Sequence, residues 1–455
     1  MTTPLTSLER FALGRRKRKQ LPRAGHAGWK SEDRKEDPLK LLAAAEKGRV
    51  PALVTLKHKR MACSPFGYFR GAVPVMAYDL STRPNTGLHT QLCGDAHVRN
   101  LGAFAGPDGR LVFDINDFDE TIAGPFEWDV KRMATSLILA GREAGGTDPH
   151  CREAAGIFVE QYVAMMRAFW KMPVLEVAKY QVHRLQNVVP VEQILALAQR
   201  ATPLSSLERF TEPTAKPKKA EKAQDADHDP QPSGTPGRIF RTEKPVLKRL
   251  TGAAAQHVID SLAAYTETLQ HERQHFLAQY RVIDVAFKVV GTGSVGLRDY
   301  CVYMEGNGPK DPLFLQIKEE AHSAYAPYLA NSGPDHQGRR VVEGERAMQI
   351  QSDPFLGWTE IQGRDYLVRQ LNDHKASIDL ADLKATGLME YAAVCGEMLA
   401  RGHARAGDSA TLAGYIGGSE RFEEAIVDFA MAYADQTEKD WKALVRSTKN
   451  GSMTK

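Results

Sequence analysis

Cysteine is scarce in this 455-residue chain, and no two cysteines are spaced as C-x-x-C. The five are scattered, at Cys63, Cys93, Cys151, Cys301 and Cys395. An odd, scattered set argues against a disulfide framework and a cysteine-based zinc site, and it suits a reducing compartment. The sequence also lacks an apolar leader near its start and any uninterrupted apolar run of about 18 residues, so it predicts neither a signal peptide nor a transmembrane helix. We therefore expect a cytoplasmic protein.

A strong net charge is missing as well. Lys and Arg number 60 against 56 Asp and Glu, which gives a net charge of +4. This balance is too even to indicate nucleic acid or an anionic membrane as a partner. A short basic run covers residues 15–19, and such a run is more typical of a solvated tail than of a nucleic-acid arm.

Changes in composition divide the chain into five segments. Residues 1–38 are polar and basic and predict a flexible N-terminus. Residues 39–210 predict a helical lobe interrupted by a strand, a turn and a second strand. Residues 211–245 are rich in Pro, Lys, Asp and Ala and predict a linker or a disordered loop. Residues 246–375 predict one long helix (247–280) followed by several strands, and residues 376–455 predict further helices. The pattern is that of an α+β protein with two lobes.

The stretch over residues 93–132 concentrates acidic side chains. It opens with Gly94-Asp95-x-His97-x-x-Asn100 and continues, after a glycine-marked turn and a short apolar strand, with a group of polar residues: Asp114, Asn116, Asp117, Asp119 and Glu120. Mg²⁺ prefers carboxylate and amide oxygens together with water and phosphate. The stretch therefore predicts a site that holds a divalent cation against phosphates.

A glycine-rich motif follows a predicted strand further along the chain, at Gly291-x-Gly293-Ser294-x-Gly296. In a dinucleotide-binding fold a helix would come next, but here the chain continues as a strand, a turn and a further strand that ends in Lys318. This is the order of a kinase nucleotide lobe, in which glycines let the backbone approach ATP phosphates and a lysine neutralises them. The next predicted helix carries Glu345, which we expect to position Lys318.

The loop Gly94-Asp95-x-His97-x-x-Asn100 resembles the G-D-x-H-x-x-N loop of the aminoglycoside phosphotransferase and choline kinase group. The chain also resembles a bacterial family known as domain of unknown function 2252. That likeness is carried by the stretches KRMACSPFGYFRG, CGDAHVRNLG, FDINDFDET, GPFEWDVKR, VVGTGSVGLRDY and LQIKEE. The second family implies no activity, whereas the first implies a two-lobed, protein-kinase-like fold. Because the glycine motif here follows the catalytic loop, that fold would have to be circularly permuted.

The kinase-like resemblance implies a role for each matching residue. Asp95 would be the catalytic base or would position the acceptor, and His97 would orient the loop. Asn100 and Asp114 would bind metal, while Lys318 would contact phosphates beside a loop shaped by Gly291, Gly293 and Gly296. Two further carboxylates, Asp117 and Asp119, could bind a second metal, hold Lys131 or Arg132, or cap the turn.

These observations predict a Mg²⁺- and ATP-dependent phosphotransferase that acts on a hydroxyl of a small molecule, and Arg60 and Arg70 hint that this acceptor is anionic. Three alternatives stay open. The chain could bind nucleotide without turnover, or it could transfer AMP. The motif His271-Glu272-x-x-His275 could also belong to a zinc peptidase, although no third zinc ligand follows at a convincing spacing.

Overall fold

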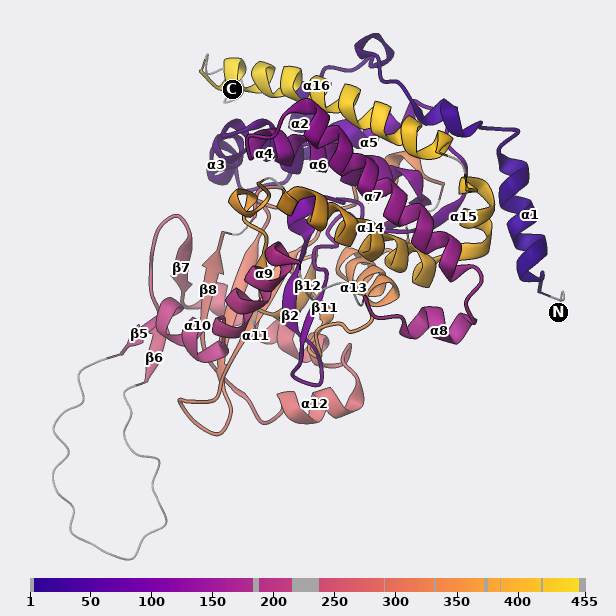
Figure 1. Cartoon of the computed structure of the whole chain (residues 1–455). Coiled ribbons are helices and arrows are strands. Elements are labelled where there is room, and N and C mark those ends of the chain that lie inside the picture. The colour runs from indigo at the N-terminus through magenta and orange to yellow at the C-terminus, as the bar shows by residue number, and fades with distance from the viewer. Residues whose placement is uncertain are drawn as a thin grey trace, which may run out of the picture.

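The computed structural model describes residues 4–182, 188–214, 237–289, 291–330, 333–371, 375–384, 386–418 and 420–449. It is an α+β structure with a helix-rich lobe and a lobe built on an antiparallel sheet (Figure 1). None of the described helices is long and apolar enough to cross a membrane.

The sheet lobe contains six antiparallel strands in the order β11-β12-β10-β9-β8-β7. The strands are β7 (Leu247–Leu250), β8 (Arg281–Lys288), β9 (Asp299–Glu305), β10 (Pro312–Glu319), β11 (Gly357–Ile361) and β12 (Arg364–Gln370). Four helices accompany them: α10 (Pro203–Phe210), α11 (Ala253–Thr266), α12 (His271–Leu277) and α13 (Gln337–Met348). The several strands predicted after residue 280 are thus present, as β8 to β12.

Side chains alternate between the two faces of this sheet, because successive residues of a strand point to opposite sides. Leu315 and Ile317 of β10 join a core that includes Val258 and Tyr265 of α11. Phe314 faces the other way, into a second core with Phe210 of α10. Lys318 therefore lies on the same face as Phe314, and this is the face that turns toward the helical lobe.

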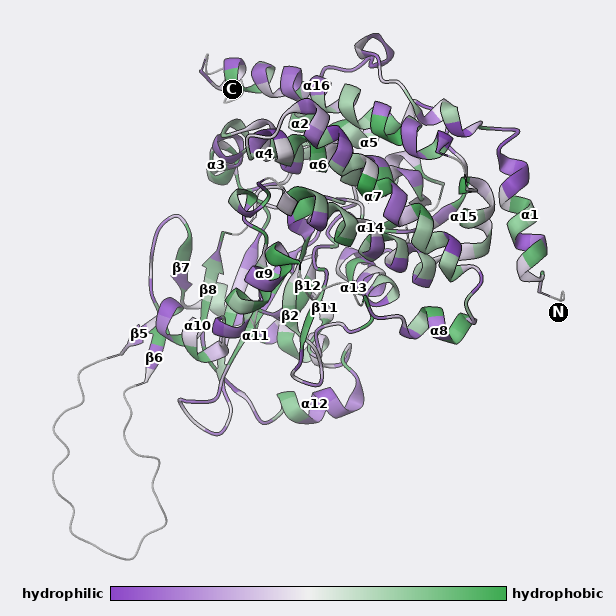
Figure 2. Cartoon of the chain, in the orientation of Figure 1, coloured by the Kyte–Doolittle hydropathy of each residue, from purple (hydrophilic) through white to green (hydrophobic). Residues whose placement is uncertain are grey.

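The helical lobe holds the largest core of the described chain. Its helices are α1 (Ser7–Lys17), α2 (Pro38–Ala45), α3 (Pro51–Ala62), α4 (Pro65–Gly71), α5 (Val73–Ser81), α6 (Glu127–Glu143), α7 (Asp148–Phe169), α8 (Val174–Lys179), α9 (Val189–Arg200), α14 (Thr386–Ala406), α15 (Ser409–Ile416) and α16 (Arg421–Lys449). In α16, Phe422, Ile426, Phe429 and Tyr433 are buried at spacings of three and four residues, which is one face of a helix. Figure 2 shows the corresponding alternation of hydropathy along this helix.

Three small sheets complete the fold. The strands β1 (His89–Leu92) and β4 (Ile122–Pro125) form one pair, and β5 (Thr211–Pro213) and β6 (Arg238–Phe240) form another. The third sheet has the order β13-β2-β3, from Ala376–Ser377, Leu101–Ala105 and Leu111–Ile115. The β2–β3 hairpin presents the acidic residues that follow it. Strand β13 lies after the sheet lobe in the sequence and pairs with β2, which lies before it. This pairing joins the N-terminal and C-terminal parts of the helical lobe.

Two expectations about local structure differ from the observed fold. The predicted helix over 247–280 is instead β7, α11 and α12, because Gly252, with a φ of +62°, and the residues between the two helices interrupt it. The N-terminal segment was expected to be flexible, but α1 packs on α15, and His26 and Trp29 are buried. Most of the predicted linker, residues 215–236, lies outside the described residues.

Candidate active site

A cleft of about 370 Å³ lies where the two lobes meet. One wall carries Asp95 and His97, and the acidic segment adds Asp117, Asp119 and Glu120. The opposite wall is the loop between β8 and β9, with Gly291, Thr292, Gly293 and Ser294. Lys318 of β10 forms an ion pair with Asp119, 199 residues away in the sequence. The fold therefore brings the two predicted motifs together in one cavity.

The loop that carries Asp95 is fixed from α6. The carboxylate of Asp129 accepts hydrogen bonds from the backbone N–H groups of Cys93 (2.8 Å) and Gly94 (3.0 Å). Gly94 has a φ of +82°, and a Cβ atom there would lie 2.1 Å from the carbonyl oxygen of Glu120. Only glycine fits this close approach without strain, so the loop that carries Asp95 and the acidic segment are held directly against each other.

The two carboxylate oxygens of Asp95 have different surroundings. Both Nε (2.7 Å) and Nη2 (2.5 Å) of the fully buried Arg132 donate to its Oδ1. The other oxygen, Oδ2, lies 3.6 Å from Nε2 of His97. Burial raises the pKa of Asp95 to about 6, although Arg132 works in the opposite direction. The role of Arg132 was not predicted, since the sequence offered it only as a partner for Asp117 or Asp119.

His97 and Asn100 shape this loop from within. His97 caps the 3₁₀ turn Val98–Asn100, because its Nδ1 accepts from the backbone N–H of Arg99 at 3.2 Å. Burial and the cations Arg70 and Arg132 hold the pKa of His97 well below its usual value, so the ring is neutral. Asn100 donates through Nδ2 to the backbone oxygen of Asp95 at 2.6 Å. Asn100 thus braces Asp95, and it does not line the cleft.

Asp114 does not occupy the metal-binding position that the sequence predicted for it. Its carboxylate is completely buried and is paired with Arg401 of α14, and the backbone N–H of Ile115 donates to the same oxygen at 2.7 Å. Strand β3 ends at Ile115, and the chain then turns, so that Asp117 and Asp119 enter the cleft instead. The candidate metal ligands are therefore Asp117, as predicted, and Asp119.

Lys318 and these two carboxylates form a tight charged group. Nζ of Lys318 lies 3.8 Å from Oδ1 of Asp117 and contacts Asp119 more closely. Burial alone would lower the pKa of Lys318, but Asp119 and Asp117 outweigh it and raise that pKa. Burial and repulsion by Asp117 raise the pKa of Asp119, whereas Lys318 and Arg369 hold the pKa of Asp117 below its usual value in spite of burial. Lys318 is therefore a cation, and Asp117 is ionised.

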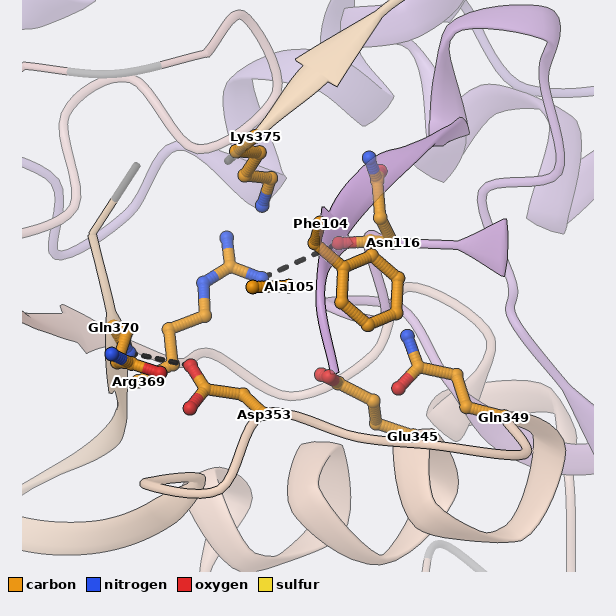
Figure 3. A pocket seen from close by; sticks show the side chains of 9 residues that line it. All are labelled: Phe104, Ala105, Asn116, Glu345, Gln349, Asp353, Arg369, Gln370 and Lys375. Carbon is orange, nitrogen blue, oxygen red and sulfur yellow. Dashed lines mark hydrogen bonds between the residues drawn. The ribbon is translucent and has the colours of Figure 1, made fainter. Parts of the chain in front are cut away.

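Glu345 does not hold Lys318, contrary to the prediction. It lines a separate cavity of about 40 Å³ together with Arg369 and Lys375. Figure 3 shows Glu345 rising from α13 toward Phe104, with the two cations on the other side of the pocket. Burial raises the pKa of Glu345 to about 7, and its Oε2 has no hydrogen-bond partner among the described residues.

The glycine loop is tied to the segment that precedes α3. Nη1 of Arg49 donates to the carbonyl oxygens of Gly293 (2.9 Å) and Val295 (2.7 Å), and Val50 donates to that of Gly296 at 2.7 Å. Arg60 binds the carbonyl oxygen of Gly291. Arg60 is thus engaged with the loop and is not placed to anchor an anionic acceptor, whereas Arg70 lines the cleft.

The HERQH motif lies on α12, on the outer side of the sheet lobe (Figure 1). Within the described part of the chain, no group of three or more His, Cys, Asp or Glu side chains could hold a metal ion. A catalytic zinc requires three protein ligands, so the described geometry gives the peptidase alternative no site.

Comparison with known proteins places the chain in one family. The family model described as an uncharacterized protein conserved in bacteria (DUF2252) matches residues 49–447. The chain belongs to this family. The matched DUF2252 region contains Asp95, the glycine loop and Lys318, and every residue that lines the cleft except Leu41, Ala44 and Ala45. No curated protein and no solved structure matches the chain.

Proposed function

We propose that this DUF2252 protein is a Mg²⁺- and ATP-dependent phosphotransferase that acts on a hydroxyl group of a small molecule. One observation carries the proposal: Lys318 is paired with Asp119, and Asp119 and Asp117 line the cleft together with Asp95 and the glycine loop. Phosphoryl transfer needs a phosphate-binding lysine, metal-binding carboxylates and a carboxylate for the acceptor within the length of one triphosphate.

The order of elements in the sheet lobe supports a kinase-like reading. A strand, a glycine loop, a second strand and a third strand ending in lysine are followed by α13 and a hairpin. In space the strands run β8-β9-β10-β12-β11. This is the arrangement expected of a kinase nucleotide lobe, here placed after the catalytic loop in the chain. We therefore propose a circularly permuted kinase-like fold.

The carboxylates of the cleft fit Mg²⁺. Asp117 offers a buried Oδ1 that has no hydrogen-bond partner among the described residues, and Asp119 lies beside it. Mg²⁺ is commonly held by one or two carboxylates, with substrate phosphates and water completing the shell. When bound, the ion would neutralise charge on the phosphate oxygens.

Asp95 is suited to receive the acceptor's proton. The acceptor hydroxyl oxygen would form a bond to the γ-phosphorus of ATP, while the bond from that phosphorus to the β–γ bridging oxygen breaks. The hydroxyl proton passes to Asp95, and ADP leaves with the electron pair of the broken bond. Arg132 holds Oδ1 of Asp95, which leaves Oδ2 to face the acceptor. Lys318 would bind the phosphates once metal replaces it on the aspartates.

The cleft limits the size of the acceptor. A volume of about 370 Å³ has to hold both the terminal phosphates and the acceptor. The walls away from the glycine loop include apolar residues, among them Leu41, Val73 and Pro74. A small hydroxyl compound with an apolar part fits this space, and we expect it to be a cytoplasmic metabolite.

The test is a calorimetric titration of ATP, with and without Mg²⁺, into the wild type and two variants. Lys318→Ala and Asp117→Asn should each weaken Mg²⁺-dependent ATP binding by at least tenfold. Asp108→Asn, the same change on the exposed β2–β3 turn, is the matched control and should bind as the wild type does. Absence of nucleotide binding to the wild type would refute the proposal. Binding with no release of phosphate or AMP in the presence of a metabolite panel would favour a nucleotide-binding pseudoenzyme.

A further inference from the structure

Arg70 occupies the point where the catalytic loop and the glycine loop meet. It lies in the last turn of α4 and lines the cleft between Asp95 and Gly293. Its backbone oxygen is 3.3 Å from the place where a Cβ atom on Gly293 would lie. Burial and Arg99 lower the pKa of Arg70, while Asp95 and Asp117 raise it, so the catalytic carboxylate and a candidate metal ligand are both within its electrostatic range.

The guanidinium of Arg70 has no satisfactory protein partner. Its one contact is from Nε to Nε2 of His97, at 3.4 Å. Nδ1 of His97 accepts a hydrogen bond from the backbone N–H of Arg99, so the neutral ring must carry its own proton on Nε2. Two N–H groups cannot form a hydrogen bond with each other. The two terminal amino groups of Arg70 make no hydrogen bond or ion pair to any residue that the structure describes.

The position of Arg70 relative to Asp95 is rigidly set. The buried Arg132 donates both to Asp95 and, at 3.0 Å, to the backbone oxygen of Phe69, the neighbour of Arg70. Its guanidinium also lies 4.2 Å from the centre of the Phe69 ring. The end of α4 and the catalytic carboxylate therefore share one clamp. A half-buried cation that has no ion-pair partner among the described residues, on a helix end fixed beside Asp95, is suited to bind an anion.

We propose that Arg70 is a further catalytic residue, whose guanidinium binds the phosphoryl group while it passes from ATP to the acceptor. The inference rests on the proposed phosphotransferase function and adds to it the group that stabilises the transferred phosphate. Arginine suits this task because its planar fork can donate two parallel hydrogen bonds to phosphate oxygens. In related chemistry, an arginine directed at the transferred phosphate increases kcat by about 10³-fold or more.

The experiment compares MgADP binding with and without aluminium fluoride, which mimics the transferred group, in the wild type, Arg70→Ala and Arg70→Lys. We expect both variants to bind MgADP with an affinity within about twofold of that of the wild type. The factor by which aluminium fluoride increases that affinity should be at least tenfold smaller in the variants than in the wild type. Arg70→Lys should retain more of that tightening than Arg70→Ala, because it keeps the charge but not the fork. Arg110→Ala removes a charge that is 88% exposed on the β2–β3 turn and is the control that should behave as the wild type does.

Thermal melting first establishes that each variant is folded, and Arg70→Lys supplies the comparison if Arg70→Ala is not. Full tightening by aluminium fluoride in both Arg70 variants would overturn the proposal. Equal loss of MgADP binding and of the tightening would also overturn it, since Arg70 would then serve ground-state binding alone. A wild type that binds no MgADP would refute the phosphotransferase function itself, and the role of Arg70 with it.

Discussion

Variants of the buried ion pair between Asp114 and Arg401 test which aspartates bind metal in the cleft and which only stabilise the fold. The side chains of Asp114 and Arg401 are 0% and 2% exposed. Arg401→Met leaves the Asp114 carboxylate without a counterion in the core. Asp114→Asn likewise leaves the Arg401 guanidinium without a counterion. Removing one partner of such a pair costs about 3–5 kcal/mol, because the remaining charge stays desolvated.

The expected change in melting temperature follows from the size of the chain. An unfolding entropy of about 2.1 cal/mol/K per residue, applied to 455 residues, gives roughly 1 kcal/mol/K. If the chain unfolds as a unit, either single variant should lower the melting temperature by roughly 3 to 5 °C. The double variant Asp114→Leu with Arg401→Met removes both charges and should regain most of the loss, since a buried pair can be replaced by apolar side chains at little cost.

Calorimetric melting and Mg²⁺-dependent ATP titration on the same samples separate stability from binding. Asp114→Asn should melt early and still bind MgATP at temperatures where it is folded. Asp117→Asn should melt close to the wild type and lose MgATP binding. The reverse outcome, with Asp114→Asn melting normally and losing MgATP binding, would show that Asp114 is the metal ligand and that the reasoning from its buried ion pair is wrong.

Three further predictions concern the same cleft. Because burial raises the pKa of Asp95 to about 6 and only its ionised form accepts a proton, nucleotide turnover should rise with pH through about 6; a rate that stays level down to pH 5 would contradict this role. Gly94→Ala should cost several kcal/mol more stability than Gly109→Ala in urea melts, because both residues have positive φ but only Gly94 would place its Cβ against backbone, 2.1 Å away; equal losses would contradict the close approach. Lys318→Met should strengthen Mg²⁺ binding in the absence of nucleotide, since the two carboxylates lose their cation; weaker Mg²⁺ binding in a titration would argue against a carboxylate site.

Local patterns in the sequence accounted for much of the fold. Short apolar runs bounded by turn residues predicted the strands β8, β9 and β10, and every residue of β10 is indeed buried. A helix-start signal is also legible in the sequence at Asp37 followed by Pro38: α2 begins at Pro38, and the Asp37 side chain caps its N-terminus. The prediction of one helix over residues 247–280 was wrong at its start, because residues 247–250 pair with β8 and form the strand β7.

Motif spacing also identified several of the charged and loop residues that meet in the cleft. Asp95, His97, Asp117, Gly291, Gly293 and Ser294 line it, and Lys318 reaches it through Asp119. These residues were found because a glycine loop and a lysine at a strand end have a local chemical reason for their positions. The sequence by itself thus determined which kinds of side chain the cleft would contain.

Only the tertiary structure decided the task of each charged group. Asp114 and Asp117 stand three positions apart, yet one is bound to an arginine 287 residues away and the other faces the cleft. Glu345 lines a different cavity, and Arg132, which the sequence offered only as a partner for Asp117 or Asp119, fixes Asp95. A buried charge must lie beside a partner because desolvation is costly, and that partner comes from whichever element the fold packs there. The residues around a charged group in the sequence therefore do not reveal which distant residue becomes its partner.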